Sequence, residues 1–208
     1  MKLAFVGSAI ILISIAAYGI NRASVAHDPM VTFAPSPVSS PLSTEPENEL
    51  VKKLQQGGSS YSDSKGIFSM LYPNDYVLDL QGNGQYIRIT KKGATQRGQT
   101  EMYDGVIMVF EPIELKGMPL AQVIDARIAE IKVSGTSELV KDKTPITVGA
   151  HSGYEYTIRS LGESTYTVLQ KDSNSPYAVS ISRLVADPEE VGYQKEVDAI
   201  FQTLQFLK

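Results

Sequence analysis

The 208-residue sequence contains no cysteine. That absence excludes disulfides, thiolate zinc sites, iron–sulfur clusters and cysteine nucleophiles. It also excludes anchoring as a bacterial lipoprotein, which requires a cysteine to acylate. Export from the cell is still compatible with this composition, because many exported proteins contain no disulfide.

Basic residues are also scarce. Lys and Arg number 19 against 23 Asp and Glu, which gives a formal net charge of −4, and no basic run is longer than two residues. A nucleic-acid-binding protein normally carries a basic surplus that neutralises phosphates. We therefore expect no nucleic-acid partner.

The clearest positive feature is an apolar segment near the N-terminus. Leu3 to Ile20 is interrupted only by Ser8 and Ser14, and no charge occurs between Lys2 and Arg22. About 18 to 20 helical residues span a bilayer core of roughly 30 Å. The segment therefore predicts one N-terminal transmembrane helix, and Lys2 favours a cytoplasmic N-terminus with the rest of the chain outside.

Two interpretations of residues 1–22 remain open. A signal anchor would leave a single-pass cell-membrane protein with an extracytoplasmic C-terminal domain. A cleaved signal peptide would release a secreted protein, and Ser24-Val25-Ala26 offers a small-x-small cleavage site after Ala26. The apolar stretch is longer than the usual signal core of roughly 7 to 15 residues, which favours the anchor.

Residues 23–60 predict an extended tether. They contain five prolines and frequent serine without apolar periodicity, and proline stiffens a chain toward polyproline II. A short helix is expected at Glu47 to Gln56, ended by Gly57 and Gly58. The folded domain is predicted to occupy residues 61–208.

Within that domain, strand patterns dominate. Two-residue alternation and short apolar runs bounded by turn residues predict strands at residues 66–72, 76–80, 86–90, 106–110, 154–159, 165–170 and 177–184. The last three follow each other through short turns, which indicates an antiparallel meander. The continuous apolar run 106–110 predicts a strand buried on both faces.

Two amphipathic helices interrupt the strands. Leu120, Val123, Ile124, Ile128 and Ile131 repeat at helical spacing between Pro119 and Gly135. A second apolar stripe runs from Tyr193 to Leu204, and Asp187-Pro188-Glu189-Glu190 predicts its start. The predicted class is α+β, a curved antiparallel β-sheet covered by helices.

Residues 66–207 resemble Mog1/PsbP-like domains. The segment Gly66-Ile67-Phe68-Ser69-Met70-Leu71-Tyr72-Pro73-Asn74-Asp75-Tyr76 is similar to the family's opening, with Tyr76 where tryptophan is common. Gly149, the passage Gly153 to Tyr156, and the ending Tyr193 to Phe206 are similar to later family segments. The resemblance implies an α/β/α sandwich and a non-enzymatic role, and it carries over no metal, cofactor or partner residue.

No catalytic, cofactor-binding or metal-binding residue is predicted, and the ligand-binding residues are unknown. His27 lies in the tether, and His151 lies in the expected turn 149–153, beside Ser152. Adjacent residues rarely form a nucleophile–base pair, so His151 is interpreted as a solvated turn residue.

Two further motifs are weighed against ordinary structural roles. The run from Asp172 begins like a calcium loop, but Arg183 occupies the position of the bidentate acid, so a turn is expected. Glu111 and Glu114 flank Pro112 and are expected to be solvated.

The ten tyrosines between Tyr61 and Tyr193 favour core packing, with a binding surface as the alternative. The first functional hypothesis is a membrane-tethered, extracytoplasmic, non-enzymatic accessory or protein-interaction module whose partner is a cell-envelope protein. The alternative is an extracytoplasmic domain that binds a glycan or a small apolar ligand in a tyrosine-lined cleft. A hydrolase would need convergent carboxylates or a buried His151.

Overall fold

A computed structural model describes residues 49–98, 102–160 and 162–208. Among them, no helix combines the length and apolarity needed to cross a bilayer. The predicted span Leu3 to Ile20, the predicted cleavage after Ala26 and His27 lie outside these ranges, as does the tether up to residue 48.

Three helices and ten strands form the described part of the chain. In order they are α1 Glu49–Gly57, β1 Ser59–Ser62, β2 Phe68–Tyr72, β3 Val77–Gln81, β4 Tyr86–Lys92, β5 Gly105–Glu114, α2 Leu120–Ser134, β6 Glu138–Val148, β7 His151–Arg159, β8 Glu163–Gln170, β9 Tyr177–Ala186, α3 Tyr193–Gln202 and β10 Gln205–Phe206.

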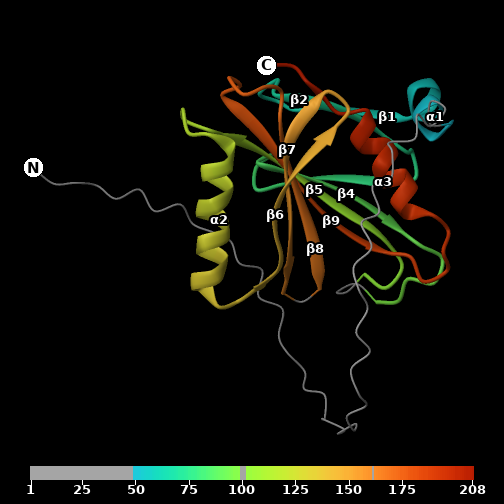
Figure 1. The fold of residues 1–208 in the computed structure, drawn as a ribbon. Helices are drawn as coiled ribbons and strands as arrows, with labels where there is room; N and C mark the ends of the chain where they lie inside the picture. Colours follow the sequence, from blue (N-terminus) through green and yellow to red (C-terminus); the bar gives the residue numbers. More distant parts are fainter. Residues whose placement is uncertain (1–48, 99–101, 161) are drawn as a thin grey trace, which may run out of the picture. The chain divides into compact units, whose positions relative to one another are not determined.

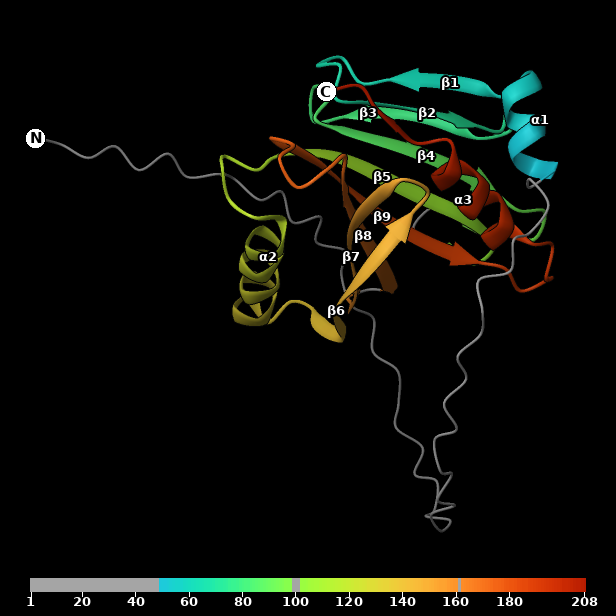
Figure 2. The same cartoon turned by 45° about the horizontal axis from the view of Figure 1, so that its top comes forward.

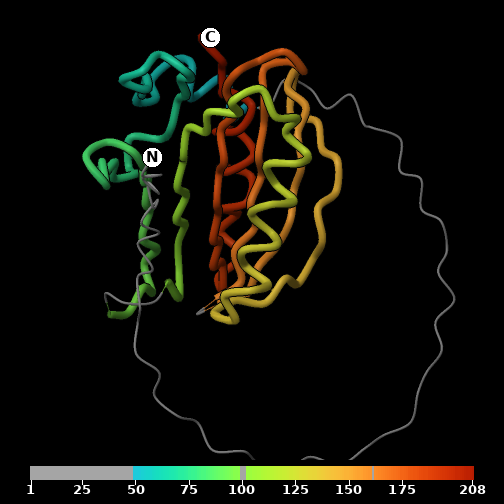
Figure 3. The backbone as a smooth tube through the Cα atoms, turned by 90° about the vertical axis from the view of Figure 1, so that its left-hand side faces the viewer, coloured from blue at the N-terminus to red at the C-terminus, as the bar shows by residue number. Residues whose placement is uncertain are grey.

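Seven strands form one antiparallel sheet in the order β3-β4-β5-β9-β8-β7-β6, and a three-stranded sheet has the order β1-β2-β10. Helix α2 lies on one side of the larger sheet and α3 on the other (Figure 1). In the view of Figure 3, α2 runs along the strands rather than across them. The α+β class predicted from the sequence is confirmed.

Two apolar clusters hold the layers together. Under α3, the core includes Phe68, Phe110 and Ile181, with Val197 and Ile200 from the helix. Under α2, the cluster consists of Ile113, Leu115, Leu120, Ile124, Ile128, Tyr156, Ile158, Val168 and Ala178. Each helix therefore buries its apolar stripe against a different face of the sheet, as the helical spacing predicts.

The predicted boundaries of α2 are confirmed. Pro119 precedes its first residue, and Gly135 ends it with φ 63°, a left-handed conformation that glycine adopts without steric cost. Helix α3 differs from its prediction, because it begins at Tyr193 rather than directly after Asp187. The Asp187 carboxylate instead accepts hydrogen bonds from the backbone N–H groups of Val191, Gly192 and Tyr193. The Asp187 side chain thus stabilises the loop that precedes the helix.

Four elements depart from the sequence pattern in some respect. Strand β6 was not predicted, and it lengthens the meander to four strands. The short helix predicted at Glu47 to Gln56 is present as α1, but α1 and β1 belong to the packed domain rather than to an extended tether: Val51 and Leu54 are buried, and β1 pairs with β2. Strand β5 buries Val106, Met108 and Phe110, whereas Ile107 and Val109 on its other face are only half-buried.

Candidate functional site

A pocket of about 280 Å³ lies between α3 and the end of the β6–β7 hairpin. Figure 2 shows this hairpin curving up beside α3. On β7 of this hairpin, a Cβ atom at Gly153 would lie 1.9 Å from the carbonyl oxygen of Val168 on β8. Only glycine allows β7 to approach β8 this closely.

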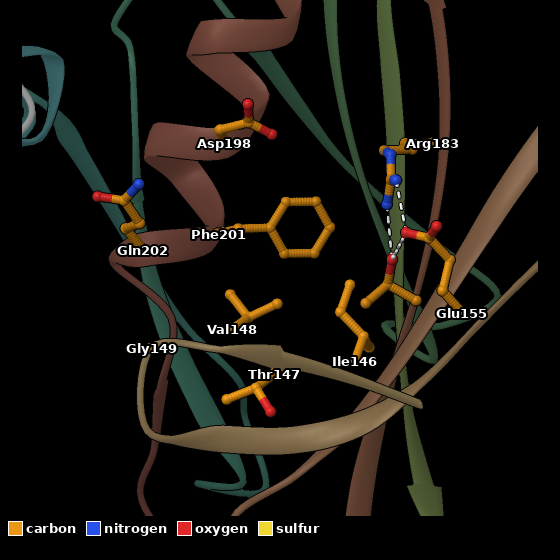
Figure 4. Close-up of a pocket in the computed structure, with 10 residues that line it drawn as sticks. Ile146, Thr147, Val148, Gly149, Glu155, Arg183, Asp198, Phe201 and Gln202 are labelled. Carbon is orange, nitrogen blue, oxygen red and sulfur yellow. Dashed lines mark hydrogen bonds and ion pairs between the residues drawn. The ribbon is translucent and has the colours of Figure 1, made fainter. Parts of the chain in front are cut away.

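Apolar side chains form one side of the pocket. Ile146 and Val148 from β6 and Phe201 from α3 point into the same space (Figure 4). Phe201 is buried, while Ile146 and Val148 are half-buried. Exposed Thr147 and Gln202 complete the rim. A partner group that entered here would therefore cover apolar surface.

The opposite side is polar and consists of one residue from each of three neighbouring strands. Glu155 on β7 lies directly opposite Thr167 on β8, and Arg183 on β9 lies opposite Thr165, diagonal to Thr167. Side chains at direct and diagonal cross-strand positions lie within reach of each other. The sheet register therefore assembles this group from residues far apart in the sequence.

The three side chains bond to one another. Arg183 Nη2 lies 2.7 Å from Glu155 Oε2, and Arg183 Nη1 donates to Thr167 Oγ1 at 2.6 Å. Thr167 in turn donates to Glu155 Oε2 at 3.3 Å. The guanidinium carbon of Arg183 lies 5.4 Å from the centre of the Phe201 ring, which is cation–π geometry.

This arrangement offers little acid–base chemistry. The two charged side chains are only 17% and 16% exposed and neutralise each other. The carboxylate of Glu155 also lies 3.7 Å from Lys141 Nζ. Within the described part of the chain, the Thr167 hydroxyl bonds to Arg183 and to Glu155, whose carboxylate is already paired with Arg183, so neither residue activates the hydroxyl as a nucleophile. The geometry suits binding with a fixed, preformed surface.

Two other charged clusters connect helices to the sheet. Glu111 Oε2 and Oε1 accept hydrogen bonds from Arg127 of α2 at 2.9 and 3.0 Å. The sequence predicted that Glu111 is solvated; the structure shows instead that it is paired with Arg127. Glu111 does not converge with Glu114, which is exposed.

On the α3 side, Lys91 Nζ lies 2.8 Å from Glu196 and 2.9 Å from Asp75. Burial lowers the pKa of Lys91, but these hydrogen bonds outweigh that effect and the pKa is raised. The pKa of Tyr76 is raised, first by burial and then by the Glu196 carboxylate. This carboxylate accepts a hydrogen bond from the Tyr76 hydroxyl at 2.9 Å. Each of the two charged clusters therefore joins a helix to the sheet.

His151 differs from its prediction. It is the first residue of β7 and is half-buried, and its ring lies edge-on to Phe206 with 4.8 Å between the ring centres. Its Nδ1 atom is buried, and among the described residues it has no hydrogen-bond partner. Ser152 follows it on the strand and is exposed, so the two side chains point to opposite faces.

The predicted turn after Asp172 is confirmed, because the Asp172 side chain accepts a hydrogen bond from the N–H of Asn174. No group of three metal-ligating side chains occurs within residues 49–98, 102–160 and 162–208.

Most of the sheet tyrosines pack as predicted. Tyr156 is buried and stacks on Tyr166 with 5.2 Å between ring centres, and Tyr154 packs against the same cluster under α2. Tyr177 packs against the other core cluster. A second pocket of about 270 Å³ lies between α1, α3 and the β2–β3 turn. Neither of the two pockets has a tyrosine in its lining.

No family model and no curated protein sequence matches the chain. Among the solved structures that are similar to it are two of low sequence identity. One is the cyanobacterial PsbP (CyanoP) of Synechocystis sp. PCC 6803, with 16% identity and a TM-score of 0.44, covering 71% of this chain and 91% of that one. The other is LpqN of Mycobacterium tuberculosis, described as involved in cell envelope biogenesis, with 14% identity and a TM-score of 0.45, covering 73% and 86%. The first of the two carries the name PsbP, which is one of the two names of the domain family that the sequence resembles.

Proposed function

We propose that this chain is an extracytoplasmic, non-enzymatic accessory module, tethered through Leu3 to Ile20, that binds a protein of the cell envelope. One observation carries the proposal. The pocket beside α3 combines an apolar wall with charged groups that already satisfy each other. Such a surface recognises a partner group by shape and burial, because Glu155 and Arg183 are already paired with each other. The remaining charged residue of the lining, Asp198, is exposed and accepts a hydrogen bond from Gln194.

The size of the pocket supports a protein partner. Small-molecule sites typically measure roughly 300–1,000 Å³ and enclose most of their ligand. This pocket, at about 280 Å³, lies at the lower limit of that range. Protein interfaces instead depend on one or two apolar or aromatic side chains that fill a small pocket near their centre. We infer that such a side chain inserts beside Phe201.

A domain that binds a glycan or small apolar ligand is the competing function. Sugar rings usually stack on exposed aromatic faces. The sheet tyrosines here serve the cores, and Phe201, the one aromatic residue in the lining, is itself stacked against Arg183. Protein binding therefore accounts better for the arrangement.

The test is proximity labelling from the tethered domain in intact cells. A version that lacks residues 61–208 sets the background. Thr147→Trp would fill the pocket from its exposed rim, and Val133→Trp, at a position that is 88% exposed on α2, is the matched control. We expect one or two enriched envelope proteins that are lost in Thr147→Trp and retained in Val133→Trp.

Equal labelling by both tryptophan variants would show that the pocket is not the binding site. Labelling at the background level in the wild type would contradict the protein-binding function, and screens of glycans and small molecules would then take its place. Full protection of the domain from protease added to intact cells or spheroplasts would contradict the extracytoplasmic location.

A further inference from the structure

The two edges of the seven-stranded sheet are unlike. Strand β6 forms one edge and carries Pro145 together with Lys141 and Lys143, and its pairing with β7 has two register shifts. Proline, lysine and bulges are the features with which proteins prevent an edge strand from pairing with another chain. The β6 edge is therefore protected.

Strand β3 forms the other edge without that protection. Within residues 49–98, 102–160 and 162–208 it pairs only with β4, in an unbroken register from Val77 to Gln81. It contains no proline or lysine, and Val77 and Leu80 are 69% and 53% exposed. A regular edge of this kind presents a row of backbone N–H and C=O groups and apolar side chains to an incoming strand.

One face of β3 continues the core. Leu78 and Leu80 lie opposite Ile89 and Ile87, both fully buried. A strand added beside β3 would place every second side chain next to Leu78 and Leu80 and extend this apolar face. Alternate side chains of such a strand therefore need to be apolar.

The other face of β3 sets the charge of the partner. Asp79 is the only charged residue of the strand and is exposed. It lies opposite Arg88 on β4, and it accepts a hydrogen bond from Gln81 at 3.2 Å. Because β3 is an edge strand, a strand added beside it would place one residue directly opposite Asp79. A lysine or arginine there would be favourable, whereas an acid would be repelled.

We propose that β3 binds, by strand addition, an extended segment of a partner protein in which apolar residues alternate with residues that include a lysine or arginine opposite Asp79. This inference rests on the proposed role as a protein-binding module and assigns it a second contact surface with defined partner chemistry. Backbone hydrogen bonds supply affinity, and the alternate side chains supply selectivity.

A second copy of this chain fits the edge less well. In antiparallel self-pairing centred on β3, the Asp79 residues of the two copies would lie opposite each other. Like charges at opposed positions destabilise a strand pair. Asp79 therefore disfavours self-association while it favours a basic segment, which is a common way to obtain selectivity.

The test uses the full chain in detergent and a capped synthetic peptide of the sequence Thr-Val-Lys-Val-Thr-Val-Lys. A second peptide has glutamate in place of lysine, and a third has every second backbone amide methylated so that it cannot complete a ladder. Binding is measured by fluorescence anisotropy, and the site by hydrogen exchange of residues 77–81.

We expect the lysine peptide to bind and to protect residues 77–81, and the methylated peptide not to bind. Asp79→Lys should weaken the lysine peptide by about three- to tenfold and strengthen the glutamate peptide, because the sign of one cross-strand pair is reversed. Asp142→Lys makes the same charge change on the exposed part of β6 and should leave both affinities unchanged. Asp79→Asn serves as the milder variant should Asp79→Lys fold poorly.

Equal lysine-peptide affinity in the wild type and in both Asp79 variants would overturn the proposal, as would protection confined to other strands or no binding at all. A wild-type dimer in sedimentation equilibrium that Val77→Lys dissociates would also overturn it, because the edge would then belong to a second copy. If the peptide tests fail but proximity labelling still depends on residue 147, the proposed protein binding at the pocket beside α3 remains supported. Conversely, peptide binding that survives Thr147→Trp separates the edge from the pocket.

Discussion

Arg183 on β9 reaches across β8 and contacts Glu155 on β7, with 2.7 Å between Nη2 and Oε2. Thr167 on the intervening strand bonds to both. The same guanidinium stacks on Phe201 of α3. One arginine therefore joins three strands and a helix, and fixes the polar side of the pocket.

Replacing this arginine should cost measurable stability. We expect Arg183→Met to lower the free energy of unfolding by about 2 kcal/mol, because a mostly buried carboxylate loses its charged partner. Glu155→Gln should cost less, and the double variant should cost less than the sum of the two. Urea unfolding measures all three.

The matched control for this pair is Arg159→Met. Arg159 pairs with Glu138 and Glu163, but its side chain is 53% exposed, so a loss of at most about 1 kcal/mol is expected. If Arg183→Met lowered the free energy of unfolding no more than this control, the network of Arg183, Thr167 and Glu155 would stabilise the fold no more than an exposed ion pair does.

Gly153→Ala should destabilise the sheet close to the turn of the β6–β7 hairpin. The new Cβ would lie 1.9 Å from the carbonyl oxygen of Val168, so one backbone must move. Overpacking of this kind costs about 1–3 kcal/mol or more. Gly57→Ala is the control, because a Cβ there meets nothing within 4 Å. Thermal melting should separate the two variants, and equal melting temperatures would rule out the close approach of β7 and β8.

Alkaline pH should destabilise the protein in part through Tyr156. Burial raises the pKa of Tyr156 to about 12, against the opposing effect of the Arg127 guanidinium. An unfolded tyrosine titrates near pH 10. The folded state therefore holds the proton more tightly, and the stability from this group is fully present below about pH 10 and is lost as the pH rises to about 12.

The free energy of unfolding lost in this way is roughly 3 kcal/mol, because the pKa of Tyr156 differs by about two units between the folded and unfolded states. Urea unfolding between pH 8 and pH 12 tests it, with phenolate absorbance as a second readout. Tyr156→Phe should lose less stability over this range than the wild type. An identical pH dependence in the two proteins would mean that Tyr156 is not the group that titrates.

Thr203→Val should loosen the junction between α3 and the small sheet. The buried Thr203 hydroxyl accepts the N–H of Leu71 at 3.0 Å and lies 2.8 Å from the carbonyl oxygen of Ile200. Valine keeps the volume but leaves the Leu71 N–H without its partner, which costs about 1–3 kcal/mol. Hydrogen exchange at Leu71 should accelerate, and Thr203→Ser should restore most of the protection. Unchanged exchange in Thr203→Val would contradict the role of the hydroxyl.

Several elements were predictable because their patterns are local. The stripe from Leu120 to Ile131 and the alternation from Tyr154 to Arg159 each fix which side chains face the core, whatever packs there. Strand β6 was missed because Lys141 to Lys143 is polar and Pro145 follows. Those residues belong to a protected edge, and an edge strand lacks the regular alternation of a strand that is half-buried.

The sequence by itself determined most of the helices and strands, the α+β class, and the predicted apolar N-terminal segment, because each of these depends on neighbours within a few turns or one strand. Only the tertiary structure decided that Arg183 meets Glu155, that Asp187 bonds to the loop before α3, and that β3 is an open edge. Contacts between distant residues depend on the order and register of the strands, and no local period encodes either.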